Sequence, residues 1–221
     1  MGKLIVIEGL DGSGKSTQLE LLHKNLIAAG VDAKTVSFPD YNEPSSALVK
    51  MYLGGEFGVK PGDVNAYAAS LFYAVDRFAS YKKHWAEYYT GGGTVIAGRY
   101  VTSNAVHQTA KLPPEQWEEY LDWLYTLEYE RVGIPKPDLV IFLDMPCEIS
   151  QKLLEKRYGG DMEKKDIHER DKIYQQNCRK AAFYNVEHAG WHRIDCSANG
   201  EARPLDDIAR DVLDAAMAVI N

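Results

Sequence analysis

Residues 6–17 read VIEGLDGSGKST, and this stretch is the strongest indication of the fold in the chain. Within it, residues 9–16 match the pattern G-x-x-x-x-G-K-[ST] at every fixed position. Glycines let the backbone curve closely enough for successive N–H groups to point at phosphate oxygens. A branched apolar run precedes the match and a helical pattern follows it, which is the context that a phosphate-binding loop requires. The stretch therefore predicts a nucleotide phosphate site at a strand-to-helix turn.

The side chains of this loop have separate expected tasks. Lys15 should reach the β- and γ-phosphates of ATP, and the Ser16 hydroxyl should ligate Mg²⁺. The helix that begins here adds free N–H groups and the positive end of its dipole. The residues expected to bind ATP are Gly9, Asp11, Gly12, Ser13, Gly14, Lys15, Ser16 and Thr17.

Outside the loop, apolar runs and helical patterns alternate along the whole chain. Strands are expected at 4–8, 35–38, 94–97, 139–143 and 191–196, and helices at 15–29, 46–53, 64–89, 114–130, 148–156, 169–189 and 205–220. The run LVIFL has no polar alternation, which is typical of strands in a sheet covered on both faces. The pattern predicts an α/β fold of the P-loop NTPase type. Its five-stranded parallel sheet would carry helices on both faces and a small lid.

The bulk composition limits the classes of protein that remain. The 221 residues, 45% hydrophobic and 26% charged, suit one domain spanning 1–221. A net charge of −7 argues against a general nucleic-acid surface. No apolar run is long enough to cross a membrane, and the three cysteines have no metal-type spacing. A cytoplasmic protein acting on small molecules is expected, with neither nucleic-acid nor membrane partners.

Several segments, taken in chain order, resemble the thymidylate kinase family over nearly the whole chain. The loop VIEGLDGSGKST, with its acidic residues Glu8 and Asp11, looks like that family's P-loop. The segment FPDY, residues 38–41, is similar to one whose last side chain helps to hold the acceptor phosphate. In LFYAVDRF, residues 71–78, the resemblance implies that Tyr73 stacks on thymine and that Arg77 bonds the base edge. Phe38 and Tyr41 are therefore expected at the acceptor.

The segment GRYVTSNAVHQ, residues 98–108, resembles the family's DRY-x-x-SN-x-x-YQ. This implies that Arg99 clamps the acceptor phosphate with Ser103 and Asn104 nearby. His107 falls where an aromatic residue crowds the ribose 2′ position, and Gln108 could bond the base. Taken singly, these side chains have plainer interpretations: Tyr73 as a core residue, Arg77 as a surface partner of Asp76, and His107 as a structural histidine.

One position departs from the family pattern, because Gly98 stands where the family has aspartate before the arginine. Without that carboxylate, Glu8, Asp11 or Asp144 would have to supply negative charge near Mg²⁺. A slow enzyme or an inactive variant is consistent with this loss, and Gly98→Asp is expected to raise turnover.

The charged segment 157–171 is expected to form a lid. In family members whose P-loop lacks arginine, the lid supplies the cation that offsets charge on the transferred phosphoryl group. This P-loop has no arginine, so the resemblance is to the bacterial type. The candidates are Arg157, Lys164, Lys165 and Arg170, and the sequence does not choose among them.

Taken together, the resemblance implies transfer of the γ-phosphoryl group from ATP to dTMP, giving dTDP and ADP. Lys15, Arg99 and Arg157 are the expected catalytic residues, with Ser16, Glu8 and Asp11 near Mg²⁺. A homodimer formed through the long helix at 64–89 is also implied. Two alternatives stay open: another P-loop nucleotide or nucleoside kinase, and a nucleotide-binding protein that transfers nothing.

Overall fold

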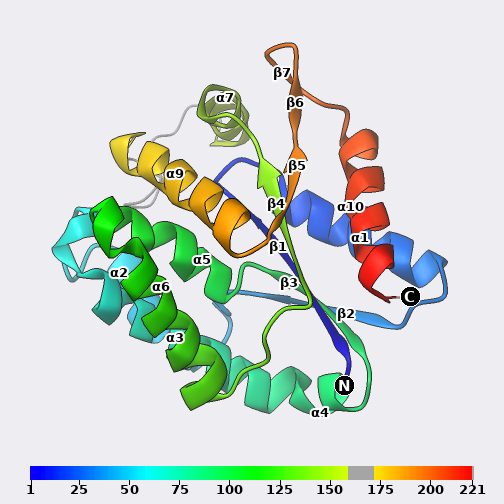
Figure 1. The fold of residues 1–221 in the computed structure, drawn as a ribbon, viewed down its shortest axis with the longest axis horizontal. Helices are drawn as coiled ribbons and strands as arrows, with labels where there is room; N and C mark the ends of the chain where they lie inside the picture. Colours follow the sequence, from blue (N-terminus) through cyan, green and yellow to red (C-terminus); the bar gives the residue numbers. More distant parts are fainter. Residues whose placement is uncertain (159–171, 221) are drawn as a thin grey trace.

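The computed structural model describes residues 1–158 and 172–220, and its centre is a five-stranded sheet (Figure 1). The strands are β1 (Lys3–Gly9), β2 (Ala33–Ser37), β3 (Thr94–Gly98), β4 (Leu139–Asp144) and β5 (His192–Asp195). They lie in the order β2-β3-β1-β4-β5, and every neighbouring pair is parallel. The predicted α/β class and five-stranded parallel sheet are confirmed.

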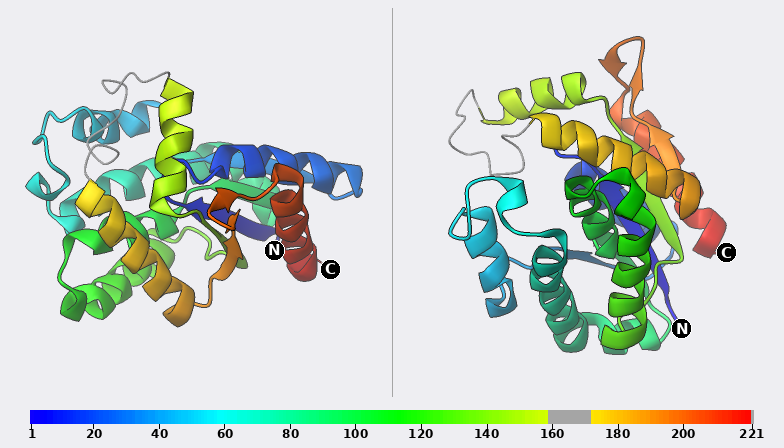
Figure 2. Two further views of the ribbon diagram at one scale, coloured as in Figure 1. Left: turned by 90° about the horizontal axis from the view of Figure 1, so that it is seen from above. Right: turned by 60° about the vertical axis from the view of Figure 1, so that its left-hand side comes forward.

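Helices cover both faces of this sheet (Figures 1 and 2). On one face, α1 (Lys15–Ala28) and α10 (Leu205–Ile220) contact each other. On the other lie α5 (Val101–His107), α6 (Trp117–Tyr125) and α9 (Lys172–His188). Because side chains alternate along a strand, β1 contributes Ile5 and Ile7 to one core, and Leu4 and Val6 to the other.

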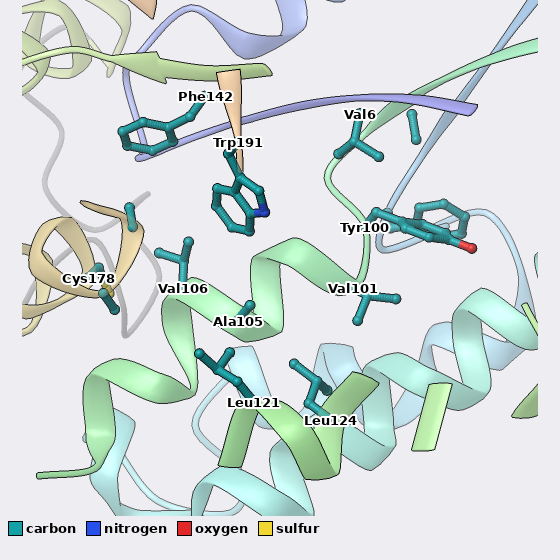
Figure 3. Close-up of a cluster of buried hydrophobic side chains, with 14 of the residues drawn as sticks. Val6, Tyr100, Val101, Ala105, Val106, Leu121, Leu124, Phe142, Cys178 and Trp191 are labelled. Atoms are coloured by element: carbon teal, nitrogen blue, oxygen red, sulfur yellow. The ribbon is translucent and has the colours of Figure 1, made fainter. Parts of the chain in front are cut away.

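The larger core gathers side chains from β1, β4, α5, α6 and α9 (Figure 3). Val106 of α5 and Phe142 of β4 are buried there, and Trp191, which precedes β5, is buried in the same cluster. This packing fixes α5 against the sheet, so residues at both ends of α5 have defined positions.

Two of the predicted helices, at 64–89 and 114–130, each contain a π-helical turn. The pattern at 64–89 resolves into α3 (Ala66–Ser80), a π-turn (Tyr81–Trp85) and α4 (Ala86–Thr90). Tyr81, Trp85 and Tyr89 recur every four residues, and an underwound turn keeps such a spacing on one buried face. The pattern at 114–130 resolves likewise into a 3₁₀ turn (Pro114–Gln116), α6 and a π-turn (Thr126–Val132).

The remaining helices are α2 (Ala47–Leu53) and α7 (Cys147–Tyr158). Among the α-helices and strands, the sequence did not predict α5, whose sequence is dominated by polar motif residues, or the short hairpin of β6 (Ser197–Ala198) and β7 (Glu201–Ala202). The 3₁₀ turns Pro61–Asp63 and Thr109–Lys111 were not predicted either. No helix in the described part of the chain is both long and apolar enough to span a membrane.

Parallel strands bring the ends of distant segments to one edge. The carboxyl ends of β1, β2 and β3 lead into the glycine loop, the FPDY segment and Arg99. The register pairs Ile7 with Gly98, and Gly98 with Ser37, so these three segments leave the sheet side by side. Open α/β sheets bind their ligands at this edge.

Candidate active site

The glycine loop after β1 has, at two of its turns, a left-handed backbone that strongly favours glycine. Gly12 has φ +78°, and a Cβ there would lie 2.7 Å from the carbonyl oxygen of Ser150. Gly14 has φ +90° and precedes α1 without a capping side chain. The first N–H groups of α1 are therefore left for an anionic ligand. The Nζ of Lys15 folds back over the loop and donates to the carbonyl oxygens of Gly9 and Leu10, both at 2.8 Å.

A cavity opens above this loop and contains most of the residues predicted to bind ATP. Its lining is Asp11, Gly12, Gly14, Lys15, Ser16, Thr17, Arg99, Leu153, Leu154 and Leu205. We call it the loop cavity. Gly9 and Ser13 are buried and are not part of this lining, and they lie close together, because a Cβ on Gly9 would meet the Ser13 hydroxyl at 2.5 Å.

A second cavity brings together every residue that the sequence predicted for the acceptor. Its lining is Asp11, Phe38, Pro39, Tyr41, Leu53, Tyr73, Arg77, Arg99, Tyr100, Ser103, Asn104, His107 and Gln108. We call it the acceptor cavity. The nine predicted residues come from the segments 38–41, α3 and 98–108, which are far apart in sequence. Buried in its wall, Oε1 of Gln108 has no hydrogen-bond partner among the described residues.

Asp11 and Arg99 line both cavities. The Nη2 group of Arg99 pairs with the carboxylate of Asp11, which also lies 3.8 Å from Lys15 Nζ. Arg99 has φ +65°, a left-handed backbone that costs a non-glycine residue on the order of 1 kcal/mol or more. Strained backbone of this kind gathers at functional sites. Two cations and one carboxylate therefore meet in the wall that the two cavities share.

Arg77 reaches the acceptor cavity but is committed to a buried ion pair. Its Nε and Nη2 groups bond the two carboxylate oxygens of Glu128, and its Nη1 group donates to the carbonyl oxygen of Tyr100 at 3.2 Å. Burial alone would lower the pKa of Arg77, but attraction to Glu128 outweighs it and the pKa is raised. The alternative pairing of Arg77 with Asp76 is wrong: Asp76 accepts from Asp40 N–H at 2.8 Å and from the Ser45 hydroxyl at 2.7 Å.

All three carboxylates considered for the region near Mg²⁺ contact protein groups, and of the three it is Asp11, paired with Arg99, that lines the loop cavity. Glu8 is fully buried and accepts hydrogen bonds from Thr102 at 2.9 Å and Ser103 at 2.7 Å. Asp144 accepts from both Arg179 and Arg193. Neither lines the loop cavity.

The residues that do line the loop cavity suit a magnesium nucleotide. Mg²⁺ keeps several waters and takes one or two protein oxygens besides phosphate, and Ser16 with Asp11 meets that need. A cluster of three or more His, Cys, Asp or Glu side chains is absent from the described residues, and this chemistry does not require one.

Sequence reasoning missed two residues that organise the acceptor cavity. Glu128 lies 51 positions beyond Arg77 in the turn after α6, and Asp76 holds the backbone of the FPDY segment. The sequence did carry one signal for Glu128, because this glutamate lies within the apolar pattern at 114–130. A carboxylate that is buried with such a pattern needs a partner. The predicted lid at 157–171 lies outside the described residues, apart from the backbone of the last two residues of α7, and the side chain of Arg157 is not described.

Comparison with known proteins agrees with these features. A family model described as thymidylate kinase matches residues 7–203. A thymidylate kinase from Mycobacterium tuberculosis is 33% identical over 191 residues, covering 85% of this chain and 87% of the relative. One from Schizosaccharomyces pombe is 30% identical over 213 residues, covering 96% and 90%. The solved thymidylate kinase of Candida albicans has a TM-score of 0.72 at 23% identity, covering 98% of this chain and 92% of that one. The similarity to the Candida albicans structure supports the fold alone.

Proposed function

This chain belongs to the thymidylate kinase family, and we therefore propose that it transfers the γ-phosphoryl group of ATP to dTMP, giving dTDP and ADP. The observation that carries the proposal is the junction of the two cavities at Asp11 and Arg99. A donor phosphate in the loop cavity and an acceptor phosphate beside Arg99 would face each other across it. In-line transfer depends mainly on such positioning and on offsetting charge.

In this proposal the loop N–H groups and Lys15 hold the β- and γ-phosphates of ATP. Lys15 leaves the carbonyl oxygens of Gly9 and Leu10 and turns to the phosphates. Arg99 binds the phosphate of dTMP. No general base is needed, because the attacking atom is already a phosphate oxyanion.

The magnesium ion belongs to the same proposal. When bound, Mg²⁺ offsets charge on the β- and γ-phosphates, and Ser16 with Asp11 would hold it. Arg157 in the expected lid at 157–171 is the proposed third catalytic residue.

Base recognition is proposed for Tyr73, Arg77 and Gln108 in the acceptor cavity. Tyr73 would stack on thymine. Because Nε and Nη2 of Arg77 are committed to Glu128, its base contact would come from the second N–H of Nη1. The Oε1 of Gln108, which has no partner within residues 1–158 and 172–220, can accept from a ring N–H of the base. Phe38, Tyr41, Ser103, Asn104 and His107 complete the proposed pocket.

We also propose that the chain acts as one cytoplasmic kinase domain that forms a homodimer. An apolar stripe runs along α3, formed by Tyr67, Leu71, Val75 and Phe78, each between 38% and 50% exposed. These side chains recur at helical spacing on one face, and contiguous exposed apolar surface marks interaction sites. A second copy of the chain, packed stripe against stripe, is the proposed partner.

The deciding experiment measures ADP release with Mg²⁺-ATP against dTMP, dUMP, dCMP, AMP, UMP and thymidine. A clear preference for dTMP is expected. Turnover of another acceptor would keep the kinase and reject the assigned base contacts. Nucleotide binding without ADP release from any acceptor would reject phosphoryl transfer by this chain, and Lys15→Ala supplies the background rate.

A further inference from the structure

The imidazole of His107 links the acceptor cavity to α9. His107 ends α5, is 6% exposed, and has a partner on each ring nitrogen. Its Nε2 atom lies 3.1 Å from Nη1 of Arg99, and its Nδ1 atom lies 3.5 Å from Sγ of Cys178 in α9. The Tyr174 hydroxyl, also on α9, donates to the main-chain oxygen of His107 at 2.7 Å. Residues of α9 therefore hold His107 on one side of the ring, and Arg99 contacts the ring on the other side.

The chemistry of these partners fixes the proton on the ring. Arginine offers only N–H donors and stays protonated, so Nε2 of His107 has to be the acceptor in the contact with Arg99. A ring that accepts at Nε2 carries its proton on Nδ1 when it is neutral. Burial raises the pKa of Cys178, which therefore remains a thiol whose sulfur can accept from Nδ1. The arrangement requires neutral His107 in the Nδ1–H tautomer.

The guanidinium of Arg99 is thus held on two sides. Nη1 donates to His107, and Nη2 pairs with Asp11, which also accepts from Gln175 Nε2 at 3.4 Å. Residues of α9 contact both of these partners of Arg99. Cys178 and Tyr174 contact His107, and Gln175 donates to Asp11. His107 and Asp11 therefore hold the two Nη groups of the guanidinium, and of these two groups Asp11 is the charged one.

We propose that His107 is a positioning residue that aims Arg99 at the acceptor phosphate by accepting a hydrogen bond from it. The inference rests on the proposed phosphorylation of dTMP. This role differs from the contact with the ribose expected from the sequence. The imidazole of His107 acts through Arg99, and it contributes the lone pair of Nε2 that accepts the hydrogen bond. Loss of that acceptor removes the hold on Nη1 while Nη2 still pairs with Asp11, so the guanidinium should turn toward Asp11 and away from the acceptor cavity.

The test compares two substitutions of His107. His107→Phe keeps a ring of similar size but removes the acceptor, whereas His107→Gln offers an amide oxygen near the place of Nε2. His107→Phe should raise the KM for dTMP by about tenfold, the lower end of what losing an orienting partner costs, with the KM for ATP within about twofold of wild type. His107→Gln should bring the KM for dTMP back to within about threefold. His188→Phe is the matched control, since its exposed ring stacks on Tyr184 and does not contact Arg99.

Equal impairment in His107→Phe and His107→Gln would overturn the inference, because ring packing and not the acceptor would then matter. An unchanged KM in His107→Phe would overturn it as well. Nitrogen-15 NMR of the wild-type ring supplies a readout that needs neither a variant nor activity: an Nδ1–H tautomer is expected, and an Nε2–H tautomer contradicts the contact. If wild type phosphorylates no dTMP, the proposed function fails, whereas the NMR measurement and dTMP binding by calorimetry still decide the role of His107.

Discussion

The guanidinium of Arg77 and the carboxylate of Glu128 form an ion pair whose side chains are only 1% and 0% exposed. Arg77 comes from α3 and Glu128 from the turn after α6, so the pair joins two helices beneath the acceptor cavity. Asn104 of α5 also donates to Glu128, at 3.4 Å, and to the carbonyl oxygen of Ser70 at 3.3 Å. One buried carboxylate thus holds together three helices that line or support the cavity.

Removing Glu128 should therefore destabilise the fold strongly. Glu128→Ala is expected to lower the free energy of unfolding by about 3–5 kcal/mol, because it leaves the Arg77 cation buried without a counterion. Urea unfolding measures the change. Asp207→Ala is the control, since it breaks an exposed pair with Arg210 and should cost about 1 kcal/mol or less. Equal costs for the two variants would contradict a special role for the buried pair.

Lys111 predicts a pH dependence of stability. Its amine donates to the Tyr52 hydroxyl and the carbonyl oxygen of Val64, and burial lowers its pKa from 10.5 to about 7. Between pH 7 and 9 the unfolded chain keeps this amine protonated while the folded chain releases the proton. The unfolded state then binds more protons, so the free energy of unfolding rises with pH in this window.

The rise attributable to Lys111 is on the order of 2 kcal/mol from pH 7 to 9. Lys111→Met cannot titrate and should lack this part of the slope. Urea unfolding of both proteins at the two pH values gives the difference directly. The same slope in wild type and Lys111→Met would show that Lys111 keeps an ordinary pKa.

The stripe on α3 predicts the response of the oligomer to a single charge. In a two-fold interface each substitution occurs twice, so Val75→Asp places two carboxylates against each other and should convert dimer to monomer. Light scattering after size-exclusion chromatography measures the mass. Ile27→Asp is a matched control, because Ile27 is 49% exposed against 50% for Val75 but lies on α1. Dimers in both variants, or a monomeric wild type, would rule out this interface.

The three central strands could be predicted from sequence because β1, β3 and β4 are nearly continuous, buried apolar runs, such as the LVIFL of β4. The edge strands β2 and β5 are mostly polar and exposed, and their place between helical patterns was the available signal. Each of the five strands lies within two residues of its expected bounds. The helices were harder, because a π-turn leaves the apolar pattern almost unchanged: Tyr81 and Trp85 fit an α-helix and a π-turn nearly equally well.

The lining of the acceptor cavity could be predicted because the resembling segments occur in the expected order. The partners of those residues could not. Arg77 pairs across 51 positions with Glu128, and His107 meets Cys178 across 71. Pairs of this kind depend on how helices pack over the sheet, and no local pattern records that packing. The nearest acidic residue to Arg77 in sequence, Asp76, serves the FPDY backbone instead.

Gly98 gives the sharpest prediction about rate. A Cβ at this position would lie 3.2 Å from Cδ2 of Leu19 and 3.4 Å from Oγ of Ser37, contacts that flexible side-chain ends can relieve. Leu19 is one turn beyond Ser16 on α1, so a carboxylate at 98 would stand beside the first turn of that helix, next to the proposed magnesium ligand. Glu8 and Asp144 are held by other groups and cannot readily replace it.

Gly98→Asp should therefore raise kcat for dTMP by about tenfold, as measured by ADP release at saturating Mg²⁺-ATP. Gly98→Asn, of equal size and without charge, should leave kcat near wild type, and a Gly98→Asp variant no faster than wild type would show that the missing carboxylate does not limit this enzyme.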